Sequence, residues 1–176
     1  VNYTDITFDE HNNQLAFDSL ANSDNYTYNG ATGSCKAYFK AQSNGLYEPH
    51  FDVVGPISLP QTSAYYATND AVGNDQYVVD FVVDACKGAD SLGVDFSQYD
   101  TNNDGILDNV FVYYAGYNQA EGGPANSIWP HKASLSWKNV KVDGKYLATY
   151  ACTSEYSGNG GKVRASIGTF CHEFGH

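Results

Sequence analysis

The sequence has no long apolar run and no cluster of basic residues. No stretch approaches the roughly 20 apolar residues that a transmembrane helix needs, so we expect no membrane span. The formal net charge is −11 at pH 7, with 9 Lys and Arg against 20 Asp and Glu. Such a charge repels nucleic-acid phosphates and anionic lipids, which argues against both as partners. No signal-peptide pattern opens the chain, which begins as if a leader had been trimmed or left out.

Closely spaced cysteine pairs are also missing. The four cysteines (Cys35, Cys86, Cys152 and Cys171) are far apart and form no Cys-x-x-Cys motif, which excludes a zinc ribbon. Three of them lie in apolar or helical contexts, so we expect mostly buried thiols. One or two disulfides remain the alternative.

What is present predicts one folded domain over residues 1–176. Hydrophobic residues make up 42% of the chain and aromatic residues 15%, as in a globular protein. Periodicity and turn residues predict helices over 10–22, over 35–42 after a Ser34 cap, and from Asp75 and Ser166 onward. They predict strands over 1–8, 46–59 and 149–155, a hairpin over 140–150 that turns at Asp143-Gly144, and a central strand over 109–116. The expected class is α+β.

The last five residues, His172-Glu173-Phe174-Gly175-His176, carry the strongest chemical signal. On a helix, two histidines four residues apart lie on one face and can bind one zinc ion. Glu173 would point toward the open side of the metal, where it can act as general base on a water molecule. The apolar residues of the same helix fall on the opposite stripe, which favours a ligand-bearing helix over a solvated one.

The histidine pair alone does not complete a zinc site. Catalytic zinc takes three protein ligands and a water molecule. His131 is a conceivable third ligand, but a histidine beside Trp129-Pro130 more often makes a structural hydrogen bond. We therefore expect that the third ligand lies beyond His176 and that the chain is truncated after the zinc motif.

The stretch from residue 100 to 108 matches the first half of a calcium loop. Asp100, Asn102 and Asp104 supply side-chain oxygens at alternate positions, and Gly105 follows. Ile106 would offer its carbonyl and Asp108 a further oxygen. Because Phe111 stands where an EF-hand has its bidentate Glu, this is not an EF-hand. A polar Asx-turn before a strand is the alternative.

Together these motifs resemble the secreted bacterial metallopeptidases of the immune inhibitor A type, which are zincins. The resemblance covers essentially the whole chain. Besides the zinc motif, its specific segments are residues 30–34 leading into Tyr38-Phe39, then 51–56, 100–108 running into 112–116, 128–131, 150–152 and 168–171.

The resemblance implies a secreted zinc endopeptidase with structural calcium, in which His172 and His176 bind zinc and Glu173 is catalytic. It implies a zincin-like upper subdomain: a twisted mixed sheet, backing helices and an active-site helix. The sequence contains no methionine, so the family's Met-turn and the rest of the lower subdomain are expected elsewhere. We expect a monomer that acts on protein or peptide substrates and is inactive as this segment alone. The competing hypothesis is a calcium-stabilised secreted binding or adhesive module with a vestigial zinc motif.

Overall fold

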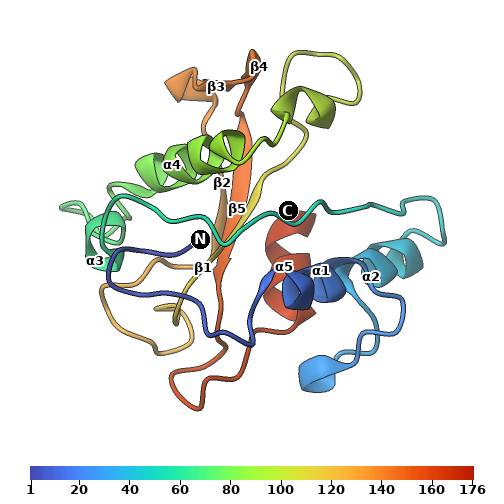
Figure 1. Ribbon diagram of the computed structural model, residues 1–176, viewed down its shortest axis with the longest axis horizontal. Helices are drawn as coiled ribbons and strands as arrows, with labels where there is room; N and C mark the ends of the chain where they lie inside the picture. The colour runs from blue at the N-terminus through green and yellow to red at the C-terminus, as the bar shows by residue number, and fades with distance from the viewer.

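A computed structural model describes all residues 1–176 and confirms the α+β class (Figure 1). The α-helices are α1 (Gln14–Asn22), α2 (Cys35–Gln42), α3 (Ser63–Tyr66), α4 (Val78–Ser91) and α5 (Ile167–Gly175). The strands are β1 (Phe111–Tyr114), β2 (His131–Ser134), β3 (Lys141–Val142), β4 (Lys145–Tyr146) and β5 (Thr149–Ser154). Short 3₁₀ helices occupy Tyr28–Gly30, Phe96–Tyr99 and Ser136–Lys138. No helix is both long enough and apolar enough to cross a bilayer.

The main sheet has three strands in the order β1-β5-β2. β1 runs parallel to β5, with Phe111 opposite Ala151. β2 runs antiparallel to β5, with His131 opposite Cys152. The sheet is therefore mixed, as predicted, but the central strand is β5. The prediction of a central strand over 109–116 was wrong, because β1 lies at the edge and its apolar residues are covered by helices and the N-terminal segment.

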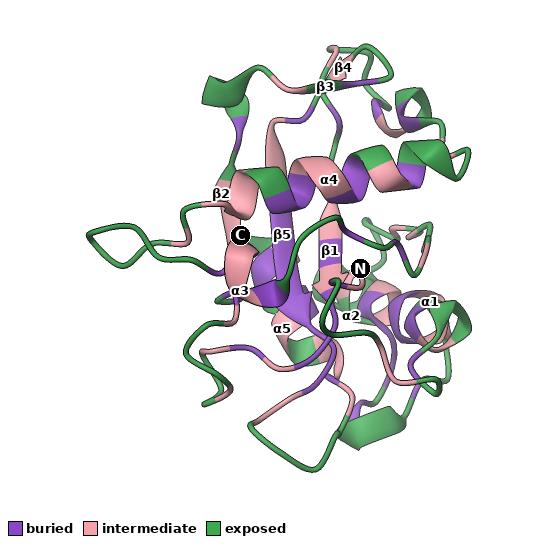
Figure 2. Ribbon diagram, turned by 60° about the vertical axis from the view of Figure 1, so that its left-hand side comes forward, coloured by how far each residue is buried: buried purple, intermediate pink, exposed green.

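Helices cover both faces of this sheet. Val112 and Tyr114 of β1 belong to the larger core cluster, together with Phe81 and Val82 of α4. The alternate residues Phe111 and Tyr113 pack instead against a second cluster that includes residues of α1, α2 and α5. Successive side chains of a strand point to opposite faces, so α4 lies on one face and α5, α1 and α2 lie on the other. Figures 1 and 2 show this arrangement, with the buried stripe of α4 turned toward β5.

Two predicted strands, over 1–8 and 46–59, do not form. Both segments are largely irregular, and they meet in a single parallel bridge between Asn2 and Ser58. The Asn2 N–H donates to the Ile57 carbonyl, and the Leu59 N–H donates to the Asn2 carbonyl. The N-terminal segment also covers the free edge of β1, where the Ala115 N–H donates to the Val1 carbonyl. These segments are held by tertiary packing and a few hydrogen bonds, without a ladder.

Local signals placed the other elements well. Ser34 caps α2 by accepting a hydrogen bond from the Ala37 N–H, so this helix has the predicted bounds. The hairpin of β3 and β4 turns at Asp143-Gly144, as expected, with both residues at positive φ. α1 begins four residues later than predicted, because Asn13 caps it. Leu20 of this helix is fully buried, whereas Leu15 is 78% exposed.

Candidate metal centre

Aromatic packing fixes the helix that carries the histidines. Phe170 of α5 is buried and stacks on Phe111 of β1, with ring centroids 4.1 Å apart. Phe51 packs edge-on against Phe170 and Phe174, and Phe39 of α2 lies 5.2 Å from Phe174. The apolar stripe predicted for this helix therefore faces the core, which leaves the opposite face of α5 free for polar side chains.

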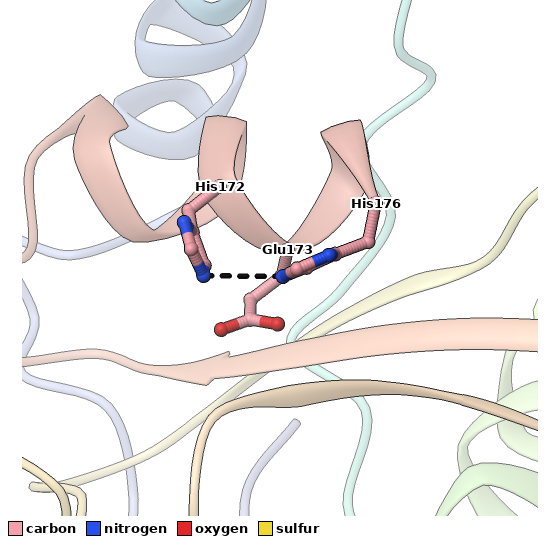
Figure 3. A group of neighbouring side chains, drawn as sticks. All are labelled: His172, Glu173 and His176. Carbon is pink, nitrogen blue, oxygen red and sulfur yellow. Dashed lines mark hydrogen bonds between the residues drawn. The ribbon is translucent and has the colours of Figure 1, made fainter.

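His172 and His176 lie on that opposite face and turn toward each other (Figure 3). Their Nε2 atoms are 3.1 Å apart. Two nitrogen ligands of a tetrahedral zinc ion, each about 2.0–2.1 Å from the metal, lie roughly 3.3 Å apart. The separation in the structure is close to that value, and both side chains are exposed. The donor type and the spacing therefore fit zinc.

Glu173 lies beneath the imidazole pair. Its residue is only 8% exposed, and its carboxylate points toward the sheet, against which α5 packs (Figure 3). The ligand atoms of His172, Glu173 and His176 nevertheless all lie within 4.8 Å of one another. The carboxylate thus borders the same point as the two imidazoles, although it is more enclosed than the predicted position on the open side.

His131 does not join this group. It pairs with Cys152 across β2 and β5, and Cys152 belongs to the core on the α4 side. Paired residues share a face, so the His131 side chain lies on the face away from α5. Both ring nitrogens are also engaged: Nδ1 lies 2.6 Å from the Trp129 carbonyl, and Nε2 lies 2.5 Å from the Tyr150 hydroxyl. His131 therefore makes the structural hydrogen bonds that its sequence context favours.

Comparison with known proteins identifies the family of this chain. A family model described as the immune inhibitor A peptidase M6 catalytic domain matches residues 2–176. The chain belongs to the immune inhibitor A (M6) peptidase family. It is 29% identical, over 171 residues, to immune inhibitor A of Bacillus thuringiensis subsp. alesti. That alignment covers 80% of this chain and 24% of the relative, so the chain spans about a quarter of the relative's length.

In the predicted calcium loop, the acidic side chains of this M6 domain contact a lysine and backbone N–H groups. Lys145 of β4 places its Nζ 2.6 Å from Asp100 Oδ2. Asp100 also accepts hydrogen bonds from the Asp104 and Gly105 N–H groups, and Asp108 accepts from Thr101. The contact with Lys145, more than the backbone donors, lowers the pKa of Asp100 below its usual value. Asp100, Asn102, Asp104, Ile106 and Asp108 stay a predicted calcium site, in which calcium would have to displace an ammonium group.

One buried charge of the M6 domain had no sequence signal. Glu155, directly after β5, is fully buried. Its carboxylate accepts hydrogen bonds from the Asp9 N–H at 2.8 Å, the Asn12 side-chain amide at 2.7 Å and the Gly116 N–H at 3.0 Å. It therefore ties the end of the central strand to the segment before α1. Its partners lie 39 to 146 residues away in sequence, so no local pattern identifies it.

An apolar cavity of about 490 Å³ borders α5 on its core-facing side. Phe170 and Phe174 line it from α5, and Phe17, Phe51 and Ala85 line it from other parts of the chain. These α5 residues are on the core-facing stripe, opposite the imidazoles. The cavity is therefore separate from the candidate metal centre, because none of His172, Glu173 and His176 lines it.

Proposed function

We propose that this domain carries the catalytic helix of a zinc-dependent endopeptidase. The observation that carries the proposal is the pair of imidazoles held 3.1 Å apart, with the Glu173 carboxylate within 4.8 Å of both. Membership of a peptidase family supports the same reading. His172 and His176 would hold the zinc ion through Nε2.

The zinc ion, when bound, would polarise the scissile carbonyl and lower the pKa of a water molecule. Glu173 would act as the general base that takes a proton from this water and later delivers it to the leaving amine. The enclosed position of Glu173 favours this role, because a carboxylate shielded from solvent interacts strongly with a nearby cation and proton. The Phe111 and Phe170 stack would keep the catalytic helix at a fixed distance from the sheet.

We further propose that β2 binds the substrate as an added strand. β2 is an edge of the main sheet, and α5 packs near it. At the opposite edge, the Val1 nitrogen donates to the Tyr113 carbonyl of β1, and the Val1 carbonyl accepts from the Ala115 N–H just after this strand. An extended peptide could therefore hydrogen-bond to the backbone of β2 without displacing another segment. The substrate that such an edge would accept is a protein or peptide in an extended conformation.

The full centre would need a third protein ligand in addition to His172 and His176. Residues 1–176 bring only His172, Glu173 and His176 together as a metal-binding group. We therefore infer that these residues form an upper subdomain, that they hold zinc weakly when expressed alone, and that they then cleave nothing. We also propose that the intact enzyme is secreted and monomeric. Efficient cleavage of a denatured protein by residues 1–176 alone would contradict this inference.

The decisive experiment replaces Glu173 with glutamine in a chain long enough to supply the third ligand. The variant should keep one zinc ion per protein and lose roughly 10²–10⁴-fold in kcat on a denatured protein substrate, the range for general acid–base catalysis. Glu10→Gln, at an exposed site before α1, is the matched control and should leave kcat unchanged. Normal turnover by Glu173→Gln would overturn the mechanism. Calcium without zinc in the wild-type protein would favour a binding module with a vestigial motif.

A further inference from the structure

Two of the four cysteines belong to the smaller core cluster. Cys35 is the first residue of α2 and is fully buried, and Cys171 of α5 is 7% exposed. Both belong to the same six-residue cluster, and the two helices that carry them pack together. They are 136 positions apart in sequence, so only the fold brings them together.

Both thiols lie in this small cluster, which α2 and α5 help to form. Burial first, and then the hydrogen bond with the Cys171 side chain, raises the pKa of the Cys35 thiol far above its usual value. The same pair faces Tyr113 of β1, whose buried hydroxyl has no hydrogen-bond partner and whose pKa is raised mainly by burial. Cys35 and Cys171 are the two cysteines of this cluster.

The other two cysteines have different surroundings. Cys86 lies on α4 and Cys152 on β5, both in the larger core on the other side of the sheet. Cys152 contacts the His131 ring at 3.7 Å and no second thiol. The four cysteines thus comprise one facing pair and two isolated thiols, and all four are reduced in this structure.

We propose that Cys35 and Cys171 form a disulfide that joins α2 to the catalytic helix α5. Cys171 directly precedes His172, so the covalent link would anchor the helix next to its first imidazole. A link across 136 positions also restricts the unfolded chain strongly, which is the condition under which a disulfide stabilises most. This inference concerns the chain's own thiols and does not depend on zinc binding or peptidase activity.

The oxidant is a low-molecular-weight disulfide such as oxidised glutathione. One cysteine thiolate attacks a glutathione sulfur, which forms a mixed disulfide and releases one glutathione thiolate. The second cysteine then attacks the protein sulfur of the mixed disulfide and releases the second glutathione. The protein pair loses two electrons and two protons, and oxidised glutathione is reduced to two thiols. Because both sulfurs are buried once the protein has folded, we expect the exchange during folding.

The test refolds the reduced protein in a glutathione redox buffer and alkylates the remaining thiols. We expect two alkylated residues, Cys86 and Cys152, and a non-reduced digest that contains the peptide pair of Cys35 and Cys171. The intact mass should fall by two hydrogen atoms. The melting temperature should be roughly 10 °C higher than that of the protein refolded with reductant. Four alkylated thiols after oxidative refolding, or a link between a different pair, would overturn the proposal.

Two variants separate the disulfide from general packing. Cys35→Ser with Cys171→Ser should abolish the effect of oxidant on the melting temperature, whereas Cys86→Ser should preserve it. If the double variant does not fold, the single variant Cys35→Ser decides: it should leave the other three cysteines reduced after refolding in the same buffer. An oxidant-dependent rise in the double variant would also count against the proposal.

Discussion

The packing of α5 predicts that shortening Phe170 will lower the free energy of unfolding substantially. Phe170 is 4% exposed and contacts Phe51, Phe111 and Phe174, with ring centroids 4.1 to 5.5 Å away. Replacing it with alanine removes a full aromatic ring from a site bordered by strand, helix and loop. Buried Phe→Ala changes cost about 3–5 kcal/mol, and the rigid sheet on one side limits how far this site can collapse. We therefore expect a loss of about 4 kcal/mol, or roughly 10 °C in melting temperature.

Urea denaturation followed by circular dichroism measures this prediction. The midpoint should fall without a change in the m-value, because the same surface is exposed on unfolding. Leu15→Ala on α1 is the control: this side chain is exposed, so its free energy of unfolding should change by no more than about 0.5 kcal/mol. A loss below about 1 kcal/mol for Phe170→Ala would refute the reasoning. It would mean that α5 detaches from the sheet independently of the rest of the fold.

Two further predictions concern buried charges. Glu155→Gln should lower the free energy of unfolding by about 2 kcal/mol. The reason is that the amide NH₂ of glutamine would face one of the three N–H donors that now bond to the carboxylate. An unchanged urea midpoint would contradict this prediction. Lys145→Met should lower the melting temperature at pH 7, because Asp100 loses the cation that lowers its pKa. A carboxyl whose pKa is lowered on folding stabilises above its unfolded value, near 4, and this contribution is lost as the pH falls through the folded pKa. The difference between wild type and Lys145→Met should therefore shrink below about pH 4, and an equal difference at pH 3 and pH 7 would count against the ion pair.

Elements with local signals were predictable from the sequence. Ser34 fixes the start of α2 and Asp143-Gly144 fixes the hairpin turn, because caps and turns depend on a few adjacent residues. β2 was missed, since His131-Lys132-Ala133-Ser134 contains no β-branched residue and no Phe, Tyr or Trp. Residues 46–59 alternate like a strand, and Ile57 and Leu59 are buried, but Leu46 and Val54 are exposed and no strand pairs with the segment. A hydrophobic pattern predicts which side chains are buried more reliably than it predicts which strands pair.

The same distinction applies to the sites. The two imidazoles converge because helix geometry relates residues four positions apart, so the sequence was sufficient to bring His172 and His176 together. The burial of Glu173 depends on how closely α5 approaches the sheet. The five-residue motif carries no information about that distance. The contact of Lys145 with Asp100 joins residues 45 positions apart and carries no local signature. The calcium-like spacing of residues 100–108 therefore gives no indication that Lys145, from the β3–β4 hairpin, contacts Asp100.

The aromatic contacts of α5 also bear on the order of folding. Phe39 and Phe51, against which this helix packs, precede it by more than a hundred residues. Contacts over such separations form slowly, because a long stretch of chain must be ordered before they are made. During synthesis from the N-terminus, the histidine-bearing helix can dock only after Phe39 and Phe51 have been made and folded into place. The two imidazoles are thus positioned later than the surface that supports their helix.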